Sequence, residues 1–399
     1  MKRGGVIVGS GIVGSAVGYE LSRRGLSDLH VIDPDRAGSL SSSERNAGGV
    51  RHLWQQSINT ELSRLSIELF TQIKDEIGFK QTGYLWLYKK GNEAAGEANF
   101  KIARSRNLDY EKLSPSDIKN RYPFLDKLDD VSFALLGRKD GIINSNALKV
   151  FFQTEAEKRG VRFHDRTALQ GLTESGATIS LRLSKLSGET ASHQFLEAGT
   201  GAENTETWEA GFVILACGPW MKRVLPVLDI PPLTSPIRRQ IALFKSESFD
   251  MTPYGMVVDT SRVYFHPEGG NILAGLVLKE EPVGFNFSFD SDFFENHIWP
   301  PLYERSSSME KLKPLGGWGG LYSYTPDTAG ILGRLPKFKQ VYEIHSFTGR
   351  GVMQAYGAAV AMADLVTLGK FDKIDASCLG RERFLSNDKS KLLPEGLHI

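Results

Sequence analysis

Residues 6–14 read Val6-Ile7-Val8-Gly9-Ser10-Gly11-Ile12-Val13-Gly14, and a second apolar run, Leu29–Ile32, is followed by Asp33. This order predicts a strand, a glycine turn, a helix and a second strand that ends at an acid. In such a unit the first glycine makes the tight turn, the second lets the backbone approach a pyrophosphate, and the third lets the helix pack closely on the strand. The helix also begins with free N–H groups that attract phosphate. The stretch therefore predicts a dinucleotide-binding unit of the Rossmann type.

Asp33 indicates which dinucleotide this unit binds. A carboxylate at this place accepts hydrogen bonds from the 2′- and 3′-hydroxyl groups of a ribose and repels a 2′-phosphate, so FAD and NAD fit better than NADP. A glycine triplet alone is weak evidence, because such triplets occur in ordinary turns. Here the predicted strand, the predicted helix and the acid all stand at the spacing from the glycines that the motif requires.

Size and charge bound the class of protein. A chain of 399 residues exceeds the usual size of a single core, so we expect two joined domains. Lys and Arg number 48 against 47 Asp and Glu, which leaves no basic excess for nucleic-acid binding. The hydrophobic content of 41% is enough for a full globular core.

Cysteine, histidine and leader patterns exclude several other classes. Cys217 and Cys378 are the only cysteines, and the eight histidines are scattered, so we expect neither a disulfide framework nor a metal site. No apolar run reaches the length of a membrane span, and too few residues precede Val6 for a signal peptide. These patterns predict a cytoplasmic protein, and they leave peripheral association with a membrane open.

The rest of the chain divides into α/β and antiparallel parts. Apolar periodicity predicts helices over residues 12–24, 59–77, 145–159 and 352–368. Residues 212–216 form a continuous apolar run that is typical of a central parallel strand. Residues 166–211 are predicted to form antiparallel hairpins with an exposed loop at 197–209. Alternating patterns predict an antiparallel sheet, with strands at 83–88, 240–245, 256–259, 263–266 and 271–275.

Two further glycine turns follow strands: Ala216-Cys217-Gly218-Pro219-Trp220 and Phe347-Thr348-Gly349-Arg350-Gly351. A helix begins directly after the second of them. Its N-terminus could place partial positive charge on the pyrimidine side of a flavin. The alternative is a turn that merely joins a strand to a helix. A nicotinamide enzyme does not need a distant C-terminal segment beside its cofactor, whereas a buried flavin does, so FAD is favoured.

Together these motifs resemble the D-amino-acid oxidase-like family of FAD-dependent oxidoreductases, and within it the branch of sarcosine oxidase, dimethylglycine dehydrogenase and glycine oxidase. The resemblance also includes Ser42-Ser43, Gly48-Gly49-Val50-Arg51 and Tyr324-Thr325-Pro326-Asp327, and it extends over nearly the whole chain. It implies an α/β fold in which a Rossmann-like FAD-binding domain is interleaved with an antiparallel-sheet substrate domain. We expect residues 1–80, 141–232 and 325–399 in the first domain, and 81–140 and 233–324 in the second.

The resemblance assigns residues to the cofactor. It implies that the backbone at Ala168, or at a neighbour in the strand after Phe163, holds adenine. The other residues implied to contact FAD are Gly9, Ser10, Gly11, Ile12, Val13, Gly14, Asp33, Ser42, Ser43, Arg45, Asn46, Gly48, Gly49, Ala216, Gly218, Trp220, Gly349, Arg350, Gly351, Val352, Met353 and Gln354.

The family takes hydride from the carbon beside a neutral amine to flavin N5, a step that needs orientation and a charge partner for a carboxylate more than a strong base. A guanidinium fork matches a carboxylate. Arg51 is the first candidate, and Arg350 and Arg239 are weaker ones, because Arg239 is equally explained as a charge at a strand edge.

Aromatic residues and one histidine complete the predicted site. Tyr322, Tyr324 and Trp318 could wall an amine and attract it by cation–π interaction, although core packing explains Trp318 equally well. His52, beside Arg51, is a candidate proton acceptor, and its alternative is a structural histidine.

Three positions depart from the sarcosine oxidases that the chain resembles. Gly320 stands where some of them carry a flavin-linking cysteine, so we expect non-covalent FAD. Met353 stands where they place a carboxylate-binding lysine. Leu273 or Ala274 falls near their oxygen-activating lysine, so electron transfer to a carrier is favoured over transfer to oxygen.

The sequence thus predicts an FAD-dependent enzyme that oxidises the C–N bond of an amino acid or N-alkylated amino acid, a dehydrogenase rather than an oxidase. Two alternatives stay open. One is a flavoprotein dehydrogenase of 2-hydroxy acids. The other is an FAD-stabilised protein that assembles with a partner and turns over little. The predicted partners are a small amine or amino acid and an electron carrier.

Overall fold

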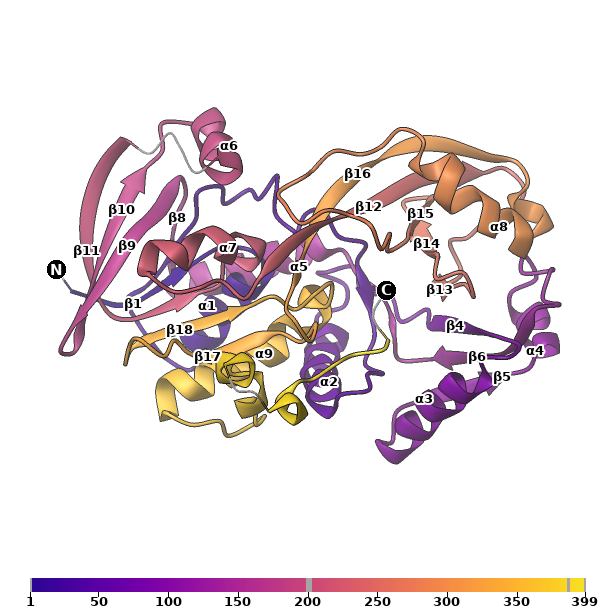
Figure 1. Ribbon diagram of the computed structural model, residues 1–399, viewed down its shortest axis with the longest axis horizontal. Coiled ribbons are helices and arrows are strands. Elements are labelled where there is room, and N and C mark those ends of the chain that lie inside the picture. Colours follow the sequence, from indigo (N-terminus) through magenta and orange to yellow (C-terminus); the bar gives the residue numbers. More distant parts are fainter. Residues whose placement is uncertain (1, 199–202, 386–387, 398–399) are drawn as a thin grey trace.

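The computed structural model describes residues 2–198, 203–385 and 388–397, and it contains two eight-stranded sheets (Figure 1). The strands of the first sheet are Lys2–Val8 (β1), Leu29–Ile32 (β2), Arg162–His164 (β8), Thr167–Ser175 (β9), Thr178–Lys185 (β10), Glu203–Leu215 (β11), Ile331–Arg334 (β17) and Val341–His345 (β18). They follow the order β17-β18-β11-β1-β2-β8, and β10 joins β9 to β11. The pairs of β1 with β2 and β11, of β2 with β8 and of β11 with β18 are parallel.

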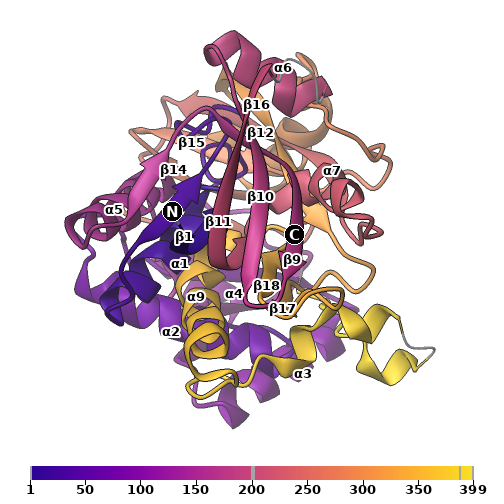
Figure 2. The same ribbon diagram turned by 90° about the vertical axis from the view of Figure 1, so that its left-hand side faces the viewer.

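The central strands of this sheet are buried on both faces, because successive side chains point to opposite sides. Ile7 and Val31 belong to the core that the helices form. Val6, Val8 and Ile32 belong to a second core on the other face. That face is covered by the antiparallel layer of β9, β10 and the first half of β11, which lies toward the viewer in Figure 2.

The core on the helical face of the sheet includes side chains of the helices Ile12–Arg23 (α1), Ser57–Gln72 (α2), Ser145–Lys158 (α5) and Gly351–Leu368 (α9). Helix α9 packs against both α1 and α2. Within the part of the chain that the structure describes, α9 is the one helix long and apolar enough to cross a membrane, and 67% of it is buried inside the protein. We therefore interpret its apolar composition as that of a core helix.

The strands of the second sheet are Tyr84–Lys89 (β4), Tyr110–Leu113 (β5), Val131–Gly137 (β6), Ser235–Ser246 (β12), Met256–Val258 (β13), Tyr264–Glu268 (β14), Asn271–Gly275 (β15) and Leu312–Tyr324 (β16). They follow the order β16-β12-β15-β14-β13-β4-β6-β5 and are antiparallel except where β13 meets β4. A small ladder pairs Gly49–Val50 (β3) with Gly141–Ile142 (β7). The predicted mixed α/β fold with a largely antiparallel second sheet is confirmed. The domain boundaries stay a prediction.

The structure corrects the sequence analysis at two places. Of the predicted loop 197–209, residues 199–202 lie outside the described part, and the rest is regular. Residues 197 and 198 end a helix, Glu189–Ala198 (α6), and residues 203–209 belong to β11. Exposed and buried residues alternate from Thr207 to Ala210, as a strand requires, but the run holds too few apolar residues to be recognised. The analysis also missed the helices Glu93–Ser105 (α3) and Pro115–Arg121 (α4), which pack on β6.

Candidate active site

A cavity of about 650 Å³ is lined by residues of both sheets, a size that suits a cofactor or ligand site. Most residues predicted to hold the cofactor or the substrate line it: Gly9, Ser10, Gly11, Ile12, Val13, Asp33, Ser42, Ser43, Arg45, Asn46, Gly48, Gly49, Arg51, Ala216, Gly218, Trp220, Arg239, Tyr322, Gly349, Arg350, Gly351, Val352 and Met353.

The β1–α1 turn forms one end of the cavity. Gly9 has a φ of +107°, a backbone conformation that favours glycine. The Asp33 carboxylate accepts hydrogen bonds from the Ser10 backbone N at 2.6 Å and from Ser10 Oγ at 3.0 Å. Burial raises the pKa of Asp33 to about 6 despite these bonds, so the carboxyl is ionised at neutral pH. It lines the cavity as an acceptor for hydroxyl groups.

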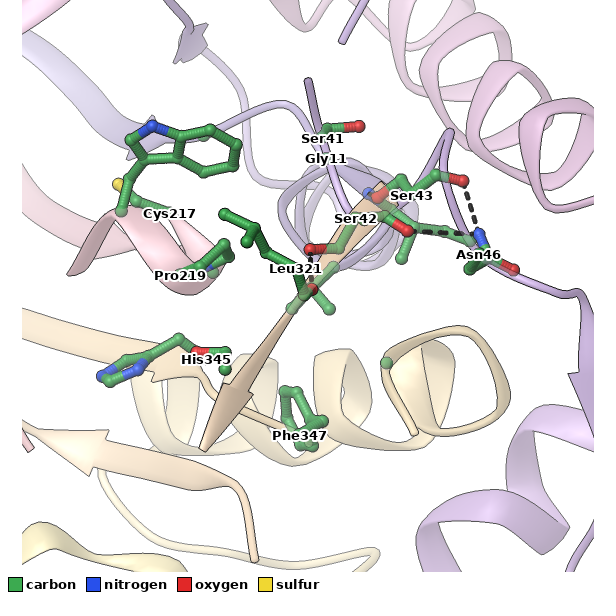
Figure 3. A pocket seen from close by; sticks show the side chains of 18 of the residues that line it. Gly11, Ser41, Ser42, Ser43, Asn46, Cys217, Pro219, Leu321, His345 and Phe347 are labelled. Carbon is green, nitrogen blue, oxygen red and sulfur yellow. Dashed lines mark hydrogen bonds between the residues drawn. The ribbon is translucent and has the colours of Figure 1, made fainter. Parts of the chain in front are cut away.

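A serine-rich loop lies between this turn and β16 (Figure 3). Ser42 Oγ donates a hydrogen bond to the Leu321 carbonyl at 2.6 Å, and Ser43 Oγ accepts one from the first N–H of α1, that of Ile12, at 2.9 Å. Asn46 Nδ2 donates to the Ser43 carbonyl at 2.6 Å. The Arg45 guanidinium donates to the Gly319 carbonyl at 2.9 Å. These bonds fix the loop between the two sheets.

The β18–α9 turn closes the cavity from a third side. Gly349 has a φ of +76°, and a Cβ on it would lie 2.5 Å from a ring carbon of Tyr322. Only glycine lets the Tyr322 ring lie against this turn. Helix α9 begins at Gly351 without a side-chain cap, and its first residues line the cavity. The positive end of the helix dipole therefore faces the cavity.

Six predicted residues do not line the cavity: Gly14, His52, Ala168, Trp318, Tyr324 and Gln354. Gly14 lies at the contact between α1 and the β1 turn. Ala168 is buried in β9 beside two residues that do line the cavity, Leu169 and Gln170. Tyr324 accepts a hydrogen bond from Arg239, and Gln354 donates one to Asn59. These residues lie next to the residues that line the cavity and hold them in place.

The histidines have structural partners. His52 is buried, and its Nδ1 pairs with the Asp140 carboxylate, which also accepts the Tyr110 hydroxyl. His345 was missed by the sequence analysis and does line the cavity. Its Nε2 lies 3.1 Å from Glu343 Oε2 and its Nδ1 lies 2.6 Å from Ser346 Oγ, so both ring nitrogens are engaged. This arrangement argues against a histidine base for an alcohol substrate.

Three arginines with unused hydrogen-bond donors line the cavity. Among the described residues, no acceptor takes a hydrogen bond from Nε of Arg51, from Nε of Arg239, or from Nε and Nη1 of Arg350. All three side chains are buried. Within residues 2–198, 203–385 and 388–397, no carboxylate lies within 4.0 Å of any of these guanidinium groups. Burial, with the charge of Arg51 adding to it, lowers the pKa of Arg350 to about 10. The cavity is thus built to receive an anion.

Aromatic rings surround these guanidinium groups. Cζ of Arg51 lies 3.6 Å and Cζ of Arg350 lies 5.2 Å from the ring centroid of Trp54. Tyr84, Met256 and Tyr264 of the second sheet also line this end. The sequence analysis missed these three residues because they lie in apolar runs that look like core, and it missed Trp54 because a single Trp in a mostly polar segment carries no pattern. Trp318 does not line the cavity, and its Nε1 donates to the Arg45 carbonyl at 3.2 Å.

The residues present fit FAD. The glycine turn with positive φ, the ionisable Asp33, two helix N-termini and the serine-rich loop form one continuous cradle, as the pyrophosphate and ribose of a dinucleotide require. The arginines and aromatic rings form the other end, where a substrate would meet the flavin. A Rossmann-type sheet that shares such a cavity with an antiparallel sheet defines a two-domain flavoprotein.

The chain matches the model of the FAD dependent oxidoreductase (DAO) family over residues 6–365, and it belongs to this family. FAD is the cofactor typical of the family. The structure is similar to that of L-proline dehydrogenase from P. horikoshii, with a TM-score of 0.84, 22% identity, and coverage of 96% of this chain and 98% of that one. At this identity the likeness concerns the fold.

Two curated relatives cover nearly the whole chain. FAD-dependent oxidoreductase domain-containing protein 1 of Bos taurus is 27% identical and covers 97% of this chain, which spans 85% of that protein. Monomeric sarcosine oxidase of Bacillus sp. (strain B-0618) is 22% identical, and the match covers 92% of each chain.

Proposed function

We propose that this flavoprotein oxidises the C–N bond of an amino acid whose nitrogen is secondary or N-alkylated. The observation that carries the proposal is the pair of buried guanidinium groups of Arg51 and Arg350, which offer free N–H donors beside Trp54 at the flavin end of the cavity. Sarcosine oxidase and L-proline dehydrogenase are named for substrates of this class. When bound, FAD supplies a two-electron acceptor for the hydride on the carbon beside nitrogen.

The residues of the chain bind and orient the substrate. Arg51 and Arg350 receive its carboxylate, because a buried guanidinium without an acceptor gains most from an anion. Trp54 and Tyr84 exclude water from the bound amine. A neutral amine needs no base to release hydride, which agrees with the engagement of His52 and His345 in bonds within the protein.

The proposed enzyme is a dehydrogenase that delivers electrons to a carrier. The described lysines that line the cavity, Lys149 and Lys222, belong to α5 and to Met221–Val224 (α7), so both come from the side of the first sheet. Leu273 and Ala274 are buried in β15 and do not line the cavity. Among the described residues no lysine of the second sheet lines the cavity, and we assign the arginines at this end to carboxylate binding and not to oxygen reduction.

The FAD is proposed to be non-covalent. A Cβ on Gly320 would lie 2.7 Å from the Arg45 carbonyl oxygen, so a cysteine does not fit there without a backbone shift. Cys217 lines the cavity, but burial raises the pKa of its thiol far above the usual value, and Sγ donates to the Val8 carbonyl at 3.3 Å. We expect acid precipitation to leave the flavin in the supernatant. A yellow pellet would show a covalent link.

The central test is reduction of the bound flavin without oxygen. Secondary and N-methylated amino acids are expected to bleach its absorbance, whereas the matching 2-hydroxy acids are expected to leave it unchanged. On admission of air, reoxidation is expected to be slow, and a dye acceptor should restore turnover. Faster bleaching by hydroxy acids would favour an alcohol dehydrogenase. If neither class reduces the flavin, the proposal is wrong.

A further inference from the structure

The substrate end of the cavity holds more positive charge than one carboxylate can neutralise. Arg51 and Arg350 are placed together, since both guanidinium groups lie over Trp54. Arg239 comes from β12 and approaches from the second sheet, with its Cζ 5.5 Å from the ring centroid of Tyr322. A single amino-acid carboxylate would pair either with Arg51 and Arg350 or with Arg239. It would leave the other positive charge without an anionic partner.

Arg239 is held with part of its guanidinium unused. Its Nη1 donates to the Arg238 carbonyl at 2.7 Å, and its Nη2 donates to the Tyr324 hydroxyl at 2.7 Å. Its Nε has no acceptor, and only 8% of the residue is exposed. Burial, the largest influence, raises the pKa of Tyr324, so the phenol stays neutral and does not compensate the charge. A buried cation with an unused donor and no compensating charge is stabilised by an anionic ligand.

The FAD phosphates do not account for this charge. They are expected at the Gly9–Gly14 turn and the serine-rich loop, whereas Arg239 lies on β12 of the second sheet, the sheet that also supplies Ile241, Met256 and Tyr264 to the lining. The Tyr322 ring lies against Gly349, the residue before Arg350, and its centroid lies 5.5 Å from the Cζ of Arg239. Burial raises its pKa to about 12, and the charges of Arg239, Arg51 and Arg350 all act against that rise. The charge of Arg239 and the charges of Arg51 and Arg350 therefore act on the same tyrosine ring.

We propose that the substrate is a dicarboxylic amine, in which Arg51 and Arg350 receive the carboxylate on the oxidised carbon and Arg239 receives a second carboxylate. This inference rests on the proposed function. Met353, also on the cavity lining, is uncharged, so the second cationic contact comes from β12 instead of α9. The Tyr322 ring lies beside the chain that joins the two carboxylates.

The first test compares binding of two inert ligands to the holoenzyme. Thiodiglycolate carries two carboxylates around a sulfur atom that replaces the amine, and methylthioacetate lacks one of them. We expect titration calorimetry and perturbation of the flavin spectrum to show at least tenfold tighter binding of thiodiglycolate. Equal affinities would overturn the inference without any variant. They would leave the proposed function intact if monocarboxylic amino acids still reduce the flavin.

The second test assigns the preference to Arg239. In Arg239→Met the affinity for thiodiglycolate should fall at least tenfold to that for methylthioacetate, which should change less than threefold. Arg239→Lys should retain part of the preference. Arg334→Met, which removes an exposed charge on β17 away from the cavity, should keep the wild-type preference. Flavin content and circular dichroism report whether each variant folds. A preference that survives in folded Arg239→Met would refute the assignment.

Turnover offers an independent comparison. Iminodiacetate and N-methylglycine differ only in the second carboxylate. The ratio of their kcat/KM values is expected to favour iminodiacetate in the wild type and to fall at least tenfold in Arg239→Met. A ratio unchanged by the substitution would contradict the role of Arg239. Absence of flavin reduction by these compounds and by the other secondary and N-methylated amino acids, with dicarboxylate binding still observed, would instead contradict the proposed function.

Discussion

Replacing Gly14 by alanine is expected to remove most of the bound FAD and to lower the melting temperature by several degrees. A Cβ at this position would lie 1.9 Å from the carbonyl oxygen of Gly9 and 3.3 Å from the Cβ of Ala216. The first contact is with backbone, which cannot rotate away. Either α1 moves off the sheet or the Gly9–Gly11 turn opens, and overpacking of this kind costs about 1–3 kcal/mol or more.

Gly18 provides the matched control in the same helix. A Cβ there would meet its nearest neighbours, side-chain atoms of Ile7 and Val31, at 3.6 Å, which is ordinary contact. Alanine also favours a helix over glycine by up to about 1 kcal/mol. We therefore expect Gly18→Ala to keep its FAD and to melt at or above the wild-type temperature. The ratio of flavin to protein absorbance and a thermal melt measure both variants. Wild-type FAD content in Gly14→Ala would contradict the predicted role of Gly14.

Replacing Arg350 by methionine is expected to stabilise the apoprotein and to weaken ligand binding. The buried guanidinium has two unpaired donor atoms, and burial lowers its pKa from the usual value of an arginine to about 10. A shift of this size corresponds to a cost on the order of 3 kcal/mol for holding the charge. Loss of the bond to the Thr328 carbonyl offsets about 1 kcal/mol of the gain. Carboxylate binding should weaken at least thirtyfold, because a buried charge contact is worth about 2–5 kcal/mol.

The pKa shift of Arg350 determines how the stability gain of Arg350→Met depends on pH. Because the pKa of Arg350 is lower in the folded state, the free-energy cost of its charge is fully present below about pH 10 and declines as the pH rises above that value. The stability gain of Arg350→Met should therefore be constant from pH 6 to 9. Urea unfolding of the apoprotein measures it, and titration with methylthioacetate measures the loss of binding.

Arg383 is the informative control for Arg350. It is equally buried, but its Nε donates to Asp327 at 2.8 Å, and its other nitrogens donate to backbone carbonyls. Arg383→Met leaves a buried carboxylate without its partner, which typically costs about 3–5 kcal/mol. The two substitutions should change stability in opposite directions. A destabilised Arg350→Met would show that the free guanidinium serves the fold and not a ligand.

The β1–α1–β2 unit could be predicted because its determinants are local. The glycine spacing, the apolar strands and Asp33 all lie within a segment of about thirty residues, where backbone sterics decide the structure. The β10–β11 pairing and α3 could not be predicted in the same way. Their apolar signals are weak, and they are stabilised by neighbours that the chain supplies elsewhere.

The residues of the site also divide into those that could be predicted from the sequence and those that could not. The sequence identified the glycine turns, Arg51 and Arg350 as residues of one site. It could not identify Trp54 or Tyr84, since an aromatic residue on a cavity wall has the same sequence context as one in a core. Nor could it tell that His52 faces Asp140, a residue far along the chain.

By itself the sequence determined that this chain forms a dinucleotide-binding α/β fold, because turn sterics and strand patterning act over short distances, and its motifs resemble those of the FAD-dependent oxidoreductase family. Only the tertiary structure decided which charges are free to bind a ligand. Arg238 and Arg239 are adjacent on β12, yet Arg238 pairs with Glu281 and Asp290 while Arg239 keeps an unpaired Nε at the cavity. Side-chain pairing and desolvation depend on neighbours in space, and those come from segments distant in sequence.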